Sequence, residues 1–201
     1  MREYLAICIR RKMQTSETVT IERRVFTITE YDQMIKAGIL MEDEPVELMS
    51  GEIVKKPTTT SRHAGMVSRL SNLLSIGLKN RGIVSVKNPI HLDPYSEPEP
   101  DVVVLKYRDD FYSESLPRPT DVLLLTEVAD TSLSYDRHVK VPLYAKAGIL
   151  EVWVVDVENE QIYVYRNPVR GKYQETFVVK RGETIALVAF PEVVLQVDEI
   201  L

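Results

Sequence analysis

Residues 122–156 read VLLLTEVADTSLSYDRHVKVPLYAKAGILEVWVVD and carry the clearest structural pattern in the chain. The two ends of this segment, 122–128 and 151–156, are rich in leucine and β-branched residues, which predicts strands buried on both faces. The segment 134–147 predicts a helix, and Gly148 is a favoured residue just beyond a helix end. Together these elements predict an α/β (α+β) fold with a mixed sheet.

Segments on both sides extend this pattern. Ser50 and Gly51 separate two short apolar runs, which is typical of a tight hairpin. Apolar residues at three- and four-residue intervals in 63–78 predict an amphipathic helix. Further strands are predicted at 83–86 and 101–105, and a meander of shorter strands at 161–165, 173–179 and 193–197.

The start of the chain differs from the remainder. Residues 1–25 mix charged and polar residues without sustained periodicity, so we expect an N-terminal arm there. We expect 26–201 to form a single domain. Thr29 is a good N-cap for its first helix, predicted over 30–37, and Gly38 suits the position after the helix end.

Composition indicates a globular protein. The 201 residues are 44% hydrophobic and 27% charged, which excludes a disordered, collagen-like or disulfide-scaffold chain. A chain of this length buries about 70% of its surface on folding and needs no disulfide or metal to do so. The single cysteine, Cys8, and the absence of a long apolar run favour a cytoplasmic protein without a membrane span. A net charge of −5 argues against avid non-specific nucleic-acid binding.

Two acidic residues lie at the ends of predicted buried strands. Asp101 opens one apolar run and Glu127 lies near the end of the next. If the two strands are neighbours, both carboxylates could converge on one divalent cation, with the main-chain carbonyl of Val128 completing an oxygen-rich site suited to Mg²⁺. The alternative is a turn aspartate and a glutamate that reaches solvent. Strand alternation predicts one shared face for Leu123, Leu125, Glu127 and Ala129.

A second set of polar residues shares one face of the following helix. Asp136, Lys140 and Tyr144 are spaced four residues apart. One interpretation is a surface ion pair between Asp136 and Lys140, worth a few tenths of a kcal/mol. The other is a lysine that points back toward Glu127 and stabilises charge on a phosphate.

Two further candidates lie upstream. Glu47 alternates with apolar neighbours in the predicted hairpin, so its side chain could point away from theirs. His63 begins the long helix, where a lone histidine could be catalytic, a cap or a surface residue. The sequence lacks a glycine-rich phosphate loop, zinc-ligand spacing and a nucleophile elbow, which excludes those mechanisms.

Taken in order, these segments resemble the Uma-type family of restriction endonucleases, formerly catalogued as a domain of unknown function. The resemblance extends from about residue 26 to the C-terminus and is most specific from 127 to 156. The matching positions are 47–53, His63, 100–104, 127–128, 135–137, Lys140, 144–149 and 151–156.

The resemblance implies a restriction-endonuclease-like core of the PD-(D/E)xK type, in which helices flank a mixed central sheet. It implies that Asp101 and Glu127 hold Mg²⁺ or Mn²⁺, that Glu47 is an early acidic residue able to join them, and that DNA phosphodiesters are hydrolysed. The motif has lysine where this chain has Ala129, so Lys140 is the candidate to supply that ammonium group. His63 matches a family position with an open role, and Tyr144 and Trp153 are assigned to packing.

Three functions follow as hypotheses. The first is a Mg²⁺-dependent endonuclease acting on DNA, more naturally double-stranded, as a homodimer because cutting two strands needs two sites. The second is a catalytically inactive nuclease-like module for binding or self-association. The third is a metal-dependent nuclease acting on RNA. Fold alone does not choose among them.

Overall fold

The computed structural model describes residues 23–41 and 43–201, so nearly all of the predicted N-terminal arm lies outside the described residues. The helical elements are α1 (Ile28–Lys36), α2 (Ser61–Leu78), the 3₁₀ turn η1 (Pro119–Asp121), α3 (Leu133–Tyr135), the π-helix η2 (Asp136–Lys140), α4 (Val141–Ala147) and α5 (Val197–Ile200). The strands are β1 (Val46–Met49), β2 (Glu52–Lys55), β3 (Gly82–Val86), β4 (Val102–Lys106), β5 (Val122–Ala129), β6 (Glu151–Asp156), β7 (Gln161–Val169), β8 (Lys172–Lys180), β9 (Thr184–Ala186) and β10 (Val194–Gln196).

A six-stranded sheet in the order β3-β4-β5-β6-β7-β8 forms the centre of the molecule. Within it β5 and β6 are parallel and the other neighbouring strands are antiparallel. The crossover between the two parallel strands runs through α3, η2 and α4, because parallel neighbours need a long connection. The mixed sheet flanked by helices confirms the predicted fold class.

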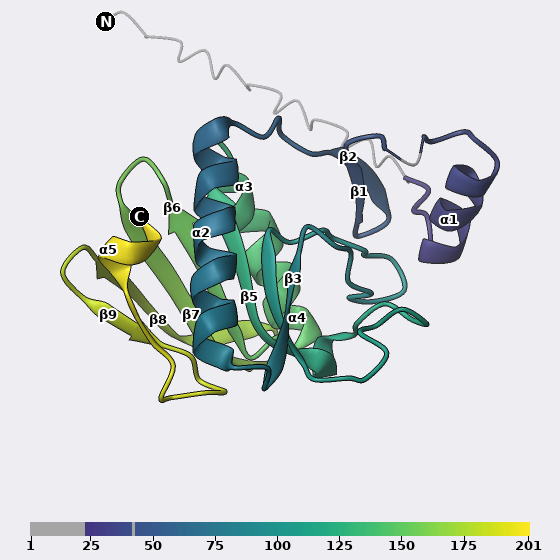
Figure 1. Cartoon of the computed structure of the whole chain (residues 1–201). Coiled ribbons are helices and arrows are strands. Elements are labelled where there is room, and N and C mark those ends of the chain that lie inside the picture. The colour runs from purple at the N-terminus through teal and green to yellow at the C-terminus, as the bar shows by residue number, and fades with distance from the viewer. Residues whose placement is uncertain (1–22, 42) are drawn as a thin grey trace, which may run out of the picture.

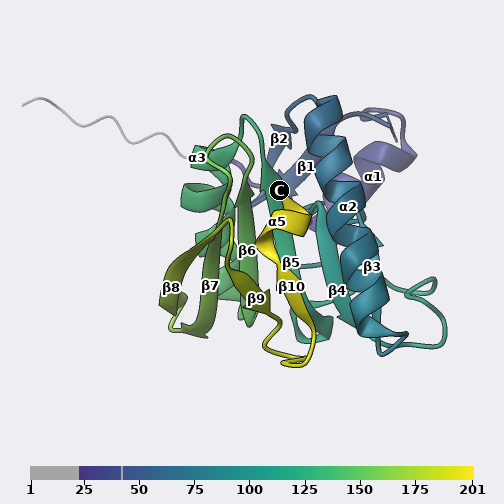
Figure 2. The same cartoon turned by 60° about the vertical axis from the view of Figure 1, so that its left-hand side comes forward.

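Helices cover both faces of this sheet. Figure 1 shows α2 lying across one face, where Leu70 and Leu74 pack on Val104 of the sheet. Figure 2 shows α5 and the β9–β10 ribbon on the same side, beside α2. On the opposite face α4 packs Tyr144 against Val154. Both faces of β4 and β5 are therefore buried, as their apolar runs predict.

The β1–β2 hairpin and α1 form a separate small unit beside the sheet (Figure 1). The turn at Ser50 and Gly51 is confirmed, with both residues at positive φ. The N-cap prediction is wrong by two residues: Thr27, not Thr29, caps α1, because Glu30 can reach back from the third helical position to complete a capping box. Gly38 follows this helix at φ +70°, as predicted.

Two of the C-terminal strands are longer than predicted. β7 and β8 each span nine residues and extend the central sheet as a hairpin. The segment predicted at 193–197 instead pairs with β9 in its own ribbon. Among the helices that the structure describes, none combines the length and apolarity needed to cross a membrane.

A register shift in β5 changes which side chains share a face. Val104 pairs with Leu124 whereas Leu105 pairs with Val122, so Leu123 is the extra residue of a bulge. Leu123 consequently packs on the α2 face, while Leu125 packs on the α4 face. The prediction that Leu123 shares a face with Leu125 and Ala129 is therefore wrong.

Candidate active site

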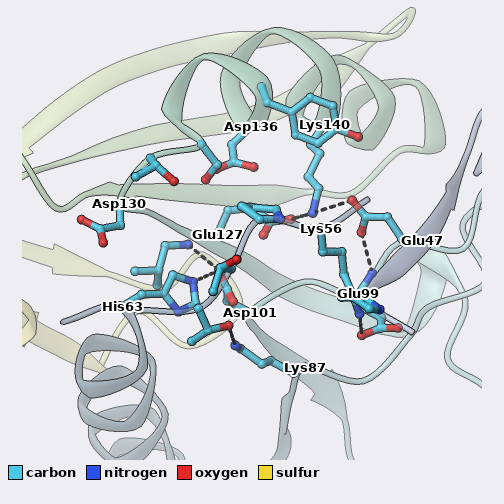
Figure 3. Close-up of a pocket in the computed structure, with 18 of the residues that line it drawn as sticks. Glu47, Lys56, His63, Lys87, Glu99, Asp101, Glu127, Asp130, Asp136 and Lys140 are labelled. Atoms are coloured by element: carbon cyan, nitrogen blue, oxygen red, sulfur yellow. Dashed lines mark hydrogen bonds and ion pairs between the residues drawn. The ribbon is translucent and has the colours of Figure 1, made fainter. Parts of the chain in front are cut away.

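The start of β4 and the end of β5 meet at one edge of the sheet because these neighbouring strands are antiparallel. A cavity of about 540 Å³ opens there. The sequence candidates that line it are Glu47, His63, Asp101, Glu127, Val128, Asp136 and Lys140 (Figure 3). The cavity thus brings together side chains that lie far apart in the sequence.

One carboxylate oxygen of Asp101 is held from two sides. Oδ2 accepts a hydrogen bond from the main-chain N–H of Val128 at 2.9 Å and lies 3.0 Å from Nε2 of His63. His63 reaches it from the first turn of α2, whose N-cap Thr60 accepts from the His63 N–H. Within the part of the chain that the structure describes, Oδ1 has no hydrogen-bond partner. Asp101 therefore presents one fixed and one free oxygen.

Pro100, which precedes Asp101, leaves one carbonyl of the neighbouring strand β5 without a main-chain donor. Val102 pairs with Thr126, and continuing this antiparallel register by two residues sets Pro100 opposite Val128. Proline has no N–H and cannot donate to the Val128 carbonyl. Because the N–H and C=O of one strand residue point toward the same neighbour, this carbonyl faces the same edge as the N–H that binds Asp101.

Glu127 is buried on the α4 side of β5. Its Oε1 accepts a 2.5 Å hydrogen bond from the Tyr144 hydroxyl and lies 3.3 Å from Nζ of Lys140. Among the described residues, no side chain or main chain bonds to Oε2. Burial raises the pKa of Glu127 to about 8, against the opposing attraction of the Lys140 ammonium group.

Lys140 lies between two acidic residues. Its Nζ is 3.2 Å from Oε1 of Glu47 and 3.3 Å from Oε1 of Glu127. Burial would lower the pKa of Lys140, but the surrounding carboxylates outweigh it and raise the pKa above its usual range. Lys140 therefore stays charged. One ammonium balances only one of two buried carboxylates, which agrees with a Glu127 that retains its proton.

Both oxygens of Glu47 are engaged. Oε1 faces Lys140, and Oε2 accepts from the main-chain N–H of Glu99 at 3.2 Å. Val46 and Leu48 pack into the small cluster beside α1, whereas the Glu47 side chain points the other way into the cavity, as its position in the hairpin predicts. Glu47 differs in this respect from Asp101 and Glu127, which each keep one oxygen free.

A π-helix places Lys140. Pro142 follows it by two residues and cannot donate the usual helical hydrogen bond, so the chain widens to a bond from Val141 N–H to the Asp136 carbonyl. Asp136 is buried and accepts from the Ser132 hydroxyl at 2.5 Å. The surface ion pair considered for Asp136 and Lys140 is therefore wrong: both side chains are buried, and Lys140 pairs with Glu47 and Glu127 instead.

The donor groups fit a divalent cation. In residues 23–41 and 43–201 no three histidine, cysteine or acidic side chains form a ready-made metal centre. Two carboxylates with one free oxygen each, and a strand carbonyl at the same edge, nonetheless form the kind of all-oxygen set that Mg²⁺ prefers when water completes its shell. The residues thus suit a magnesium ion held by few protein ligands.

Sequence reasoning missed several residues of this cavity. The sequence predicts a packing role for Tyr144, but its hydroxyl also donates to Glu127. Lys56 pairs with Glu99, and Lys87 donates to Thr59 across the cavity. The i, i+4 spacing of Lys140 and Tyr144 was the available signal for the tyrosine. The loop lysines have no such periodicity, so only the fold brings them here.

Comparisons with known proteins agree with this fold. The family model Uma2, described as "Putative restriction endonuclease", matches residues 28–198. The chain is similar to a solved structure from Anabaena variabilis, titled as a putative nuclease belonging to DUF820, with 18% sequence identity and a TM-score of 0.67. That match covers 87% of this chain and 97% of the other. No curated protein matches.

These matches define a restriction-endonuclease-like protein of nuclease type. The chain belongs to the Uma2 restriction endonuclease family, as the resemblance of its segments predicts. Proteins with this kind of fold generally use divalent metal ions.

Proposed function

We propose that this protein is a Mg²⁺-dependent endonuclease that hydrolyses DNA phosphodiester bonds, with Mn²⁺ able to replace Mg²⁺. The supporting observation is the pairing of two carboxylates, each with one oxygen fixed and one free, in a cavity that also contains a charged lysine. The order of Asp101 and Glu127 on antiparallel neighbouring strands also fits the PD-(D/E)xK plan that the resemblance implies.

In this proposal Asp101, Glu127 and the Val128 carbonyl hold the metal. When bound, the metal supplies an activated water and neutralises charge on the phosphate. His63 holds the Asp101 carboxylate in place, because it contacts Oδ2 and leaves Oδ1 free for the metal. Glu47 holds Lys140 in place rather than joining the metal, because both Glu47 oxygens are already engaged.

Lys140 supplies the ammonium group that the motif places at position 129. Ala129 is 1% exposed and packs beneath α4, so a lysine at that position would have its charge buried among apolar side chains. Lys140 instead enters the cavity from the π-helix. From there its ammonium group can stabilise the negative charge that develops on the phosphate.

The direct test is cleavage of supercoiled plasmid, single-stranded DNA and RNA by the wild type in Mg²⁺ or Mn²⁺, with Glu127→Gln as the negative control. We expect metal-dependent cleavage of duplex DNA by the wild type alone. Cleavage confined to RNA would select the RNA nuclease. Absence of cleavage, with metal binding also absent, would select the inactive binding module.

Replacing Tyr144 by phenylalanine is expected to weaken Mn²⁺ binding by about tenfold, because hydrogen bonds that orient a metal ligand are typically worth 10–100-fold in affinity. The lost group is the hydroxyl that donates to Glu127. Calorimetric titration measures the change. Tyr173→Phe is the matched control, since its partly buried hydroxyl donates to the Ile149 carbonyl away from the cavity. Equal losses in both variants would show that Tyr144 has no special effect on the metal.

Metal binding is expected to strengthen as pH rises toward 8. The pKa of Glu127 is raised to about 8, so the folded protein keeps this proton at neutral pH and the metal must displace it. For the same reason the proton stabilises the metal-free fold below the ordinary glutamate pKa, and this contribution is lost as pH rises through 8. Calorimetry in two buffers of different ionisation enthalpy measures proton release. Binding with no proton release at neutral pH would contradict this prediction.

We also propose that the protein acts as a cytoplasmic homodimer, because a double-strand cut requires two sites. Light scattering of the purified protein, alone and with duplex DNA, tests the oligomeric state. A monomer under both conditions would restrict the proposed activity to nicking.

A further inference from the structure

We infer that Lys87, oriented by Thr59, binds a backbone phosphate of the nucleic acid next to the phosphate that is cleaved. The inference rests on the proposed nuclease function and adds a specific substrate contact to it. It starts from the charge balance of the cavity, which is lined by eight acidic residues and three lysines. A polyanionic substrate needs cationic contacts to approach such a surface.

Two of the three lysines have carboxylate partners. Lys140 lies between Glu47 and Glu127, and Lys56 forms an ion pair with Glu99. The Nζ of Lys87 instead donates to the Thr59 hydroxyl at 2.9 Å. Within the described part of the chain Lys87 has no carboxylate partner, so no paired acidic side chain offsets its charge.

The main chain ties Lys87 to the proposed metal ligand. Lys87 follows β3, and its N–H donates to the Asp101 carbonyl at 3.2 Å. It adopts φ 51°, a left-handed conformation that is unfavourable for a non-glycine residue. Figure 3 shows the lysine beside Asp101, with its amine directed to the same cavity. A phosphate bound here would therefore neighbour the one at the metal.

The chemistry of the pair suits a phosphate. An ammonium group has three N–H donors, and Thr59 occupies only one of them. Thr59 precedes α2, whose first turn carries no acidic residue. The neighbouring carboxylate of Asp130 is held by the Thr60 hydroxyl at 2.6 Å, whereas the Thr59 hydroxyl accepts from Lys87. Lysine contacts to phosphate position the nucleic acid without reading its sequence. Lys87 therefore contributes affinity for the nucleic acid that does not depend on base sequence.

The test is duplex DNA binding by fluorescence anisotropy at several salt concentrations, with Ca²⁺ in place of Mg²⁺ to avoid cleavage. Lys87→Gln is expected to weaken binding equally for unrelated sequences and to reduce the slope of log affinity against log salt by about 1. Lys79→Gln is the matched control, because Lys79 is an exposed lysine of similar left-handed conformation (φ 50°) at the far end of α2.

Further readouts separate this role from a structural one. Thr59→Val removes the hydroxyl but keeps the lysine, so it should leave the salt slope unchanged, and Mn²⁺ binding to Lys87→Gln should match the wild type. An unchanged slope in Lys87→Gln, with wild-type DNA binding intact, would overturn the inference alone. If the wild type binds no DNA, both the inference and the DNA endonuclease proposal fail.

Discussion

Lys140→Met is expected to lower the free energy of unfolding by about 3 to 5 kcal/mol at neutral pH, the cost of leaving buried charge without its partner. The side chains of Glu47 and Glu127 are at most 4% exposed and both face this ammonium group. Urea denaturation measures the loss. Lys146→Met, on the exposed side of α4, is the control and should change stability by less than about 0.5 kcal/mol.

The stability loss in Lys140→Met is expected to depend on pH. Without the ammonium group the pKa of Glu127, already raised by burial, rises further. A carboxyl group with a raised pKa in the folded state stabilises the fold at low pH and loses that contribution as pH rises. In the wild type Glu127 loses its proton as pH rises through about 8, whereas in the variant it keeps the proton to higher pH. The stability deficit of Lys140→Met should therefore grow as pH rises above 8. A deficit that does not grow above pH 8 would contradict the contact between Lys140 and Glu127.

Asp101→Asn is expected to reduce DNA cleavage by at least about a thousandfold, since losing a metal ligand removes several kcal/mol of transition-state stabilisation. Asparagine keeps the shape of the side chain and an acceptor for the Val128 N–H, so the fold should persist. Steady-state cleavage rates measure the loss. Asp109→Asn removes the same charge at an exposed position and should retain full activity. Comparable activity in both variants would remove Asp101 from the mechanism.

The fold could be predicted largely because its strands are buried on both faces. The apolar runs of β4, β5 and β6 define the sheet, and the crossover follows from the helical segment between the last two. The bulge at Leu123 was not predictable from alternation, since every residue near it is apolar. The N-cap was misplaced because Thr27 and Thr29 both suit a cap, and only the pairing of Thr27 with Glu30 distinguishes them.

The site was predictable only in part. A carboxylate within an apolar strand is costly to bury, so Glu127 could be singled out from its position in the apolar run 122–128. The pairing of Lys140 with Glu47 could not, because it joins residues 93 positions apart across a π-helix that Pro142 induces. Burial of Asp136 and the cavity position of Lys87 likewise depend on tertiary packing, which one-dimensional spacing does not encode.

The central claim is a divalent metal site formed by Asp101 and Glu127. Its most direct test is calorimetric titration of Mg²⁺ or Mn²⁺ into the wild type and into Asp101→Asn, with a DNA oligonucleotide present in a parallel series. The account predicts saturable binding by the wild type that disappears in the variant. Equal binding by both proteins, or none by the wild type even with DNA, would contradict it.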